Sequence, residues 1–179
     1  RQSDRVQLHQ AAAMTLLAEG KAYHSFHTQE EIDEKRREVL GRGDSFRYKT
    51  YFPPPSRDEI ERRTEAGEPY AVRLPIGDEA IRWDDLGRGA VEFPADGLDD
   101  FIFLRSDGSP TYHLSVVCDD IHSRITHVFR GEDHVSNTPK HIALYRAFDE
   151  PLPVFCHLPL IMGADKKRLS KRTGATSVE

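Results

Sequence analysis

The sequence has little of what builds cross-linked or membrane-embedded proteins. Only two of its 179 residues are cysteine, Cys118 and Cys156, and each lies in an apolar run rather than in a Cys-x-x-Cys pair. We therefore expect two buried thiols in a reducing compartment and no disulfide framework. The sequence also has no signal peptide and no apolar run long enough to cross a membrane, so a cytoplasmic location is expected.

The sequence also has fewer basic than acidic residues. The chain carries 25 Lys and Arg against 30 Asp and Glu, a formal net charge of −5. Proteins that coat nucleic acid are basic overall, so any polyanion would have to meet a local basic patch. The densest patch lies between Gly163 and Gly174, where five cations fall within residues 166–172, after the apolar run 154–162. Such a loop after a strand can bind polyphosphate, and a solvated basic turn is the alternative.

The order of apolar and polar residues predicts an α/β fold. Residues 4–19 have the apolar spacing of a helix, and a helix is also expected to begin at Thr138-Pro139. Strands joined through a helix are typical of a parallel sheet that is covered on both faces and binds ligands beyond its carboxyl ends. Apolar runs predict such strands at 101–105, 111–118, 125–131 and 154–162. Three polar groups follow them: Asp119 with Asp120, residues 130–134, and the basic loop.

The middle of the chain is predicted to form a small α+β module. Thr28 and Ser56 each open a capping box, so surface helices are expected from there to about Gly41 and Gly67. Residues 70–76 alternate like a half-buried strand, and Pro75 puts that strand at a sheet edge or near its own end. Further short strands are expected at 22–27, 81–83 and 91–93, with a loop at 41–55.

Four segments, taken in order, resemble the glutamyl-tRNA synthetases, which are class I aminoacyl-tRNA synthetases. They are Arg105 to His113 (RSDGSPTYH), Val116 to Asp120 (VVCDD), Ile125 to Lys140 (ITHVFRGEDHVSNTPK) and Arg168 to Arg172 (RLSKR). The last resembles the class signature KMSKS, with Arg168 in place of its first Lys, which keeps the charge and changes the donor geometry. Residues 1–23 resemble the helix that leads into the family's acceptor-stem-binding insertion.

The resemblance implies the middle of such an enzyme. The family's second ATP motif, His-x-Gly-His, does not occur in the sequence, and neither does the anticodon-binding domain. The implied fold class is α/β, the second half of a Rossmann-type nucleotide-binding domain with an α+β insertion. The implied domains are a catalytic-domain helix at 1–21, the acceptor-stem-binding insertion at 22–100, and the second half of the catalytic domain with its KMSKS-like loop at 101–179.

The implied function is that of a glutamate–tRNA ligase. Such an enzyme uses ATP, with Mg²⁺, to convert glutamate to glutamyl-adenylate, and then transfers the glutamyl group to the 3′ end of tRNA(Glu). The protein acts by positioning groups and stabilising charge on phosphate, so the isolated chain is expected to be inactive without its missing half. The full-length parent is expected to be a monomer without a membrane partner. Two alternatives stay open: a non-catalytic RNA-binding module that holds an acceptor stem, and an incidental α/β domain with a basic turn.

The resemblance also implies site residues. Lys171 and Arg168 are the implied catalytic residues, with Lys171 neutralising charge on the phosphates. Arg130 is the implied ligand of the substrate's side-chain carboxylate, and an ion pair with Glu132 or Asp133 is its alternative. The implied glutamate-binding set is Tyr112, His113, Leu114, Ser115, Val116 and Arg130, and the implied ATP-binding set is Asp133, Ile161, Arg168, Leu169, Ser170, Lys171 and Arg172.

The insertion departs from the family in one respect. Some members begin a zinc site with Cys-x-Cys where this chain has residues 25–27, and no other cysteine pair compensates, so zinc is not expected. His24 and His27 have the spacing of metal ligands, but they are expected to be surface residues. The basic residues of this region could follow a tRNA backbone, with a solvated face as the equal alternative: Arg36, Arg37, Arg42, Arg47 and Lys49.

Overall fold

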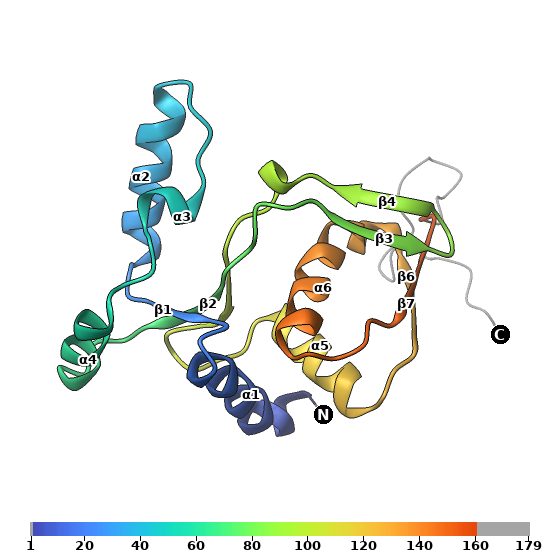
Figure 1. The fold of residues 1–179 in the computed structure, drawn as a ribbon, viewed down its shortest axis with the longest axis horizontal. Coiled ribbons are helices and arrows are strands. Elements are labelled where there is room, and N and C mark those ends of the chain that lie inside the picture. The colour runs from blue at the N-terminus through green and yellow to red at the C-terminus, as the bar shows by residue number, and fades with distance from the viewer. Residues whose placement is uncertain (1, 161–179) are drawn as a thin grey trace, which may run out of the picture.

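The structure is a computed structural model that describes residues 2–160 (Figure 1). Its helices are η1 (Gln2–Arg5), α1 (Val6–Ala18), α2 (Gln29–Gly41), α3 (Tyr48–Tyr51), α4 (Arg57–Glu65), η2 (Ala95–Gly97), α5 (Tyr112–His122), η3 (Glu132–Asn137) and α6 (Thr138–Ala147). None of the helices in this part of the chain is both long and apolar enough to cross a membrane. The KMSKS-like loop and Ile161 lie outside the described residues.

Two sheets organise the described residues. In the first, β2 (Ala71–Leu74) lies between β1 (Tyr23–Ser25) and β5 (Phe101–Leu104), and both pairings are antiparallel. In the second, the order is β4 (Gly89–Phe93), β3 (Ile81–Asp85), β7 (Val154–Leu158) and β6 (His127–Gly131). The β7 strand is parallel to both β3 and β6, which gives the α/β architecture that the sequence predicts.

Residues 22–100 are tied to the rest of the chain through both sheets. The β1 strand pairs with β2, and β2 pairs with β5. In the other sheet, β3 of the β3–β4 hairpin pairs with β7. Figure 1 shows α2 and α3 at one end of the molecule, far from α5 and α6, which lie beside β6 and β7. The bounds 1–21, 22–100 and 101–179 stay a prediction.

Several local signals give the expected elements. Thr28 forms a complete capping box with Glu31 at the start of α2, and the Ser56 hydroxyl accepts from the backbone N of Glu59 at the start of α4. Gly20, with φ +70°, follows the end of α1, and a proline lies in the first turn of α6. The expected loop at 41–55 is interrupted by the single turn of α3.

The predicted strand at 111–118 is wrong, because these residues form the start of helix α5. Its buried side chains include Leu114, Val117 and Cys118, which are three and four residues apart and so share one helix face. An apolar run of this length fits a buried strand and a buried helix equally well in sequence. The correction also moves Asp119 and Asp120 from a strand end to the last turns of a helix, where Asp119 pairs with Arg5 and His9.

The half-burial expected for residues 70–76 is also wrong. All four residues of β2 are buried, because Val72 and Leu74 pack in the main core and the ring of Tyr48 lies over the Arg73 guanidinium. The strand also lies between two others and not at an edge. Pro75 follows the last residue of β2, so it lies near the strand's end, where the missing N–H costs no ladder hydrogen bond.

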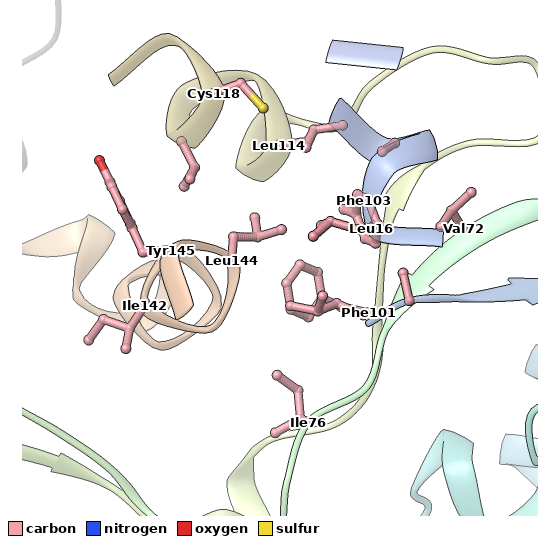
Figure 2. Packing of buried hydrophobic residues seen from close by; sticks show 14 of the residues in the cluster. Leu16, Val72, Ile76, Phe101, Phe103, Leu114, Cys118, Ile142, Leu144 and Tyr145 are labelled. Carbon is pink, nitrogen blue, oxygen red and sulfur yellow. The ribbon is translucent and has the colours of Figure 1, made fainter. Parts of the chain in front are cut away.

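The main core lies between α1, α5, α6 and the β2–β5 pair. Leu16, Phe103, Leu114 and Leu144 are fully buried there, and Figure 2 shows them converging from four different elements. A smaller cluster of Tyr23, Ile32 and Tyr48 holds α2 and α3 to the first sheet.

The junction between β3 and β7 leaves no room for a side chain at Gly87. A Cβ atom there would lie 2.4 Å from the backbone oxygen of His157, and the backbone cannot yield as a flexible side chain can. We expect Gly87→Ala to lower the free energy of unfolding by about 1–3 kcal/mol, as overpacking does. The control is Gly77→Ala, which meets nothing within 4 Å. Equal unfolding midpoints for the two variants in urea would contradict this reading.

Candidate active site

Arg130 lies one residue before the carboxyl end of β6, with its side chain half-buried. Its guanidinium donates through Nε to His157 Nε2 at 3.0 Å and through Nη1 to His141 Nδ1 at 3.2 Å. Its Nη2 donates to Thr138 Oγ1 at 2.7 Å and to the His134 carbonyl at 3.4 Å. Four neutral acceptors from three elements therefore fix the plane of the guanidinium.

The positive charge of Arg130 has no carboxylate partner within residues 2–160. The expected alternative, an ion pair with Glu132, does not form, because Glu132 pairs with Arg88 at 2.7 Å. The carboxylate of Asp133 lies against Gly131, where a Cβ atom would come within 2.5 Å of it. Burial lowers the pKa of Arg130, and Tyr112 and Asp120 oppose that shift. A half-buried cation with neutral partners favours an anionic ligand.

Tyr112 begins α5 and lies beside this cation. Its hydroxyl is 3.3 Å from His134 Nδ1, and its ring centroid is 5.8 Å from that of His141. Tyr112 is 45% exposed, so a ligand can reach this residue beside the cation. Tyr112 and Arg130, 18 residues apart in sequence, thus border the same surface.

The other residues of the implied glutamate-binding set have different surroundings. The ring of His113 lies 5.3 Å from that of His141, and burial, with the charges of Lys140 and Arg130, lowers the pKa of His113 to about 4. Leu114 points into the core, as Figure 2 shows. Ser115 is buried and Val116 is half-buried. The structure therefore brings Tyr112 and His113 to Arg130 and directs the Leu114 side chain away.

Four residues around Arg130 were missed in the sequence: Asp85, Thr138, His141 and His157. Asp85 ends β3, and its buried carboxylate accepts from His157 N at 2.9 Å, Gly87 N at 3.0 Å, Trp83 Nε1 at 3.3 Å and the His157 ring. Burial alone would raise the pKa of Asp85, but these hydrogen bonds outweigh it and lower the pKa to about 2. One signal was available, since Asp85 is in phase with Ile81 and Trp83 on the buried face of the strand.

His141 makes the fold sensitive to acid. It is 2% exposed, and burial, together with the charge of Arg130, lowers its pKa to about 3. Between pH 6.5 and 3 the unfolded state binds the proton that the folded state refuses, so stability falls as the pH falls. We expect His141→Gln to reduce by about 1–3 kcal/mol the stability difference between pH 7 and pH 4. Urea unfolding at both pH values measures it, with exposed His122→Gln as the control; parallel loss in both variants would exclude His141 as the cause.

The five basic residues that could follow a tRNA backbone are largely paired with nearby acids. Arg36 pairs with Asp33 at 3.1 Å, and Arg42 pairs with Glu38. Lys49 and Arg47 lie 2.6 Å and 3.6 Å from Asp78. The remaining one, Arg37, donates to the carbonyl of Asp33. This pairing favours the solvated-face interpretation for four of the five.

His24 and His27 are half-buried rather than surface residues, because each ring packs on an aromatic side chain. The ring of His24 is 4.5 Å from that of Tyr70, and the ring of His27 is 4.5 Å from that of Phe52. Burial lowers the pKa of both histidines. Within residues 2–160, no group of three or more His, Cys, Asp or Glu is arranged to hold a metal ion.

Six residues of the implied ATP-binding set lie outside the described residues: Ile161, Arg168, Leu169, Ser170, Lys171 and Arg172. The strand that precedes these residues, β7, ends near Arg130. The β6 and β7 strands are parallel, with Gly131 opposite Leu158, so both carboxyl ends reach the same edge of the sheet. The chain therefore leaves β7 at the edge where Arg130 lies.

Comparison with known proteins identifies the family. A sequence model described as "tRNA synthetases class I (E and Q), catalytic domain" matches residues 1–179. The chain belongs to this family. Similar class I relatives include the glutamate–tRNA ligases of Coprothermobacter proteolyticus, 46% identical over 99% of the chain, and Clostridioides difficile, 45% identical over 99%. The chain spans 38% and 36% of their lengths.

Solved structures of this class I family agree with the fold. A glutamate tRNA ligase from Elizabethkingia meningosepticum, crystallised in complex with its amino acid, superposes with a TM-score of 0.85 at 35% identity, over 97% of this chain and 36% of that one. The glutamate–tRNA synthetase of Elizabethkingia anophelis gives 0.83 at 34% identity, over 96% and 37%. The resemblance that four short segments indicated is thereby confirmed.

Proposed function

We propose that this chain forms part of a glutamate–tRNA ligase and contributes its glutamate-binding surface. The observation that carries the proposal is Arg130, a half-buried cation with neutral partners that lies beside Tyr112 at the carboxyl edge of the second sheet. Ligands of α/β sheets bind at such edges. A guanidinium fork can take a carboxylate bidentately and cannot do so with the amide of glutamine, which gives a basis for discrimination.

The reaction would need little covalent chemistry from the protein. Glutamate attacks the α-phosphate of ATP, and pyrophosphate leaves. The 3′ hydroxyl of tRNA(Glu) then takes the glutamyl group from glutamyl-adenylate, and AMP leaves. Arg130, Tyr112 and the first turn of α5 would hold glutamate, and Asp133, Ile161 and residues 168–172 would hold ATP. Mg²⁺ prefers oxygen ligands, and the phosphate oxygens of ATP supply them, so the ion would arrive bound to ATP.

The remaining parts of the proposal concern the setting. Residues 22–100 would face the tRNA acceptor stem, with residues 101–179 forming the second half of the catalytic domain. We place the full-length enzyme in the cytoplasm as a monomer. A purely RNA-binding module gains no support from the described residues, because four of the five basic side chains that could follow a tRNA backbone already pair with carboxylates.

Pyrophosphate exchange tests the proposal. The full-length protein that carries this chain, assayed with tRNA(Glu), should exchange pyrophosphate into ATP with glutamate and not with glutamine. The chain alone should show no exchange, since the His-x-Gly-His motif does not occur in it. A full-length protein without glutamate-dependent exchange would sink the proposal, and robust exchange by the chain alone would show that the missing half is dispensable.

A further inference from the structure

Asp85 is the buried end of a chain of hydrogen bonds that leads to Arg130. Its side chain has no solvent exposure and belongs to β3, within the region predicted to bind the tRNA acceptor stem. Oδ1 accepts from the backbone N–H groups of His157 and Gly87, whereas Oδ2 faces the Nδ1 of His157. On its other side, His157 Nε2 meets Arg130 Nε at 3.0 Å.

The chemistry of these groups permits one arrangement of protons. The Asp85 carboxylate, whose pKa is lowered, can only accept, so His157 Nδ1 carries the hydrogen. His157 Nε2 then presents its lone pair, which is what Arg130 requires, because a guanidinium can only donate. The reverse tautomer would place two N–H donors 3.0 Å apart. Thr138 Oγ1, 3.2 Å from the same nitrogen, bonds to Nη2 of the guanidinium and completes the support.

We propose that Asp85 is a positioning residue for glutamate binding, which sets the tautomer of His157 and through it the orientation of Arg130. This inference rests on the proposed function. It gives the region 22–100 a part in selecting the amino acid, separate from any contact with tRNA. The hydrogen bond between Asp85 and His157 joins residues 72 positions apart. It explains why a charged side chain lies on the buried face of β3.

Asp85→Asn separates positioning from simple support of the β3–β7 junction. An asparagine can keep Oδ1 as the acceptor for the two backbone N–H groups. Its amide group replaces Oδ2, so it no longer accepts from Trp83 Nε1. The amide donates towards His157 Nδ1, which moves the histidine proton to Nε2, where it faces the Nε–H of Arg130. Asp84→Asn is the matched control, because Asp84 is the preceding residue of the same strand and is exposed.

In the full-length enzyme, we expect Asp85→Asn to raise the KM for glutamate by about 10–100-fold, as sub-ångström displacement of a binding group does, with the KM for ATP within about twofold. Asp84→Asn should leave both constants unchanged. In an Arg130→Gln background, Asp85→Asn should add no further rise in the KM for glutamate, because its effect passes through Arg130. An equal rise in both backgrounds, or equal losses for glutamate and ATP, would assign Asp85 a structural role and overturn the inference.

The tautomer itself can be measured in the unmodified enzyme, without a substitution at Asp85. The ¹⁵N chemical shifts of histidine-labelled enzyme, with the His157 signals identified by their loss in His157→Gln, should show a protonated Nδ1 and an unprotonated Nε2. The opposite tautomer overturns the inference even if Asp85→Asn does not fold. The two proposals also fail differently. An unchanged KM for glutamate in Arg130→Gln refutes the assigned glutamate site, whereas a raised value there with an unchanged one in Asp85→Asn refutes only the role of Asp85.

Discussion

Arg130→Gln is expected to raise the KM for glutamate by about 10²–10³-fold in the full-length enzyme, while the KM for ATP stays within about twofold. Arg130 is the one half-buried guanidinium at the carboxyl edge of β6 in the described part of the chain, and its internal partners are all neutral. Removing its charge leaves a substrate carboxylate to be desolvated without compensation. The preference for glutamate over glutamine should fall together with the affinity, because both depend on the same fork.

Two further variants make this prediction specific. Arg130→Lys keeps the charge and loses the planar fork, so it should recover only part of the affinity. Arg82→Gln removes an exposed guanidinium on β3 that pairs with Glu92, and it should change neither constant. Initial rates of pyrophosphate exchange at varied glutamate and ATP measure all three. If Arg130→Gln changed the KM for ATP as strongly as that for glutamate, Arg130 would not be the selective carboxylate ligand.

Local signals in the sequence were enough for elements whose partners are close in the chain. The capping box at Thr28, the proline after Thr138 and the alternation of Ile81 and Trp83 each predicted the element that forms. Apolar residues without a clear period were not enough. In α5 the buried face contains Leu114, Val117 and Cys118 within a run that also has the composition of a strand, and only packing against α1 and α6 decides between the two.

The position of β2 shows a second limit. Whether a strand lies at an edge or in the centre depends on which strands pair with it, and β2 pairs with β5, about 30 residues further along the chain. Its alternating sequence indicated half-burial, but the main core covers Val72 and Leu74 and the Tyr48 ring covers Arg73. The number and order of neighbours in a sheet are therefore properties of the whole fold.

The candidate site likewise contains residues that the sequence predicts and residues that only the fold reveals. Arg130 and Tyr112 could be proposed from motifs that resemble a family, because each motif is continuous in sequence. The groups that orient Arg130 could not, since His157, His141 and Asp85 come from β7, α6 and β3. A buried hydrogen-bond network is assembled by tertiary structure, and its only trace in sequence is a polar residue in an apolar phase, as at Asp85.

Lys171→Ala is expected to lower kcat for glutamate activation by about 10²–10³-fold, with a smaller change in the KM for glutamate. Lys171 lies outside the described residues, and its role is inferred from the sequence and from where the chain leaves β7. The KMSKS-like loop follows β7, which ends beside Gly131 at the edge that also holds Arg130. A lysine brought to the phosphates from that edge would act on the charge that develops as pyrophosphate leaves, and would do less for glutamate in the ground state.

Arg168→Lys is the matched variant within the same loop. It restores the residue usual at the start of the KMSKS signature and keeps the positive charge, so kcat should stay within about threefold of the unmodified enzyme. Single-turnover formation of glutamyl-adenylate separates this step from product release in both variants. Unimpaired adenylate formation by Lys171→Ala would leave residues 166–172 as a solvated basic turn. Loss confined to Lys171→Ala would instead assign the effect to the charge at position 171 and not to the donor geometry at position 168.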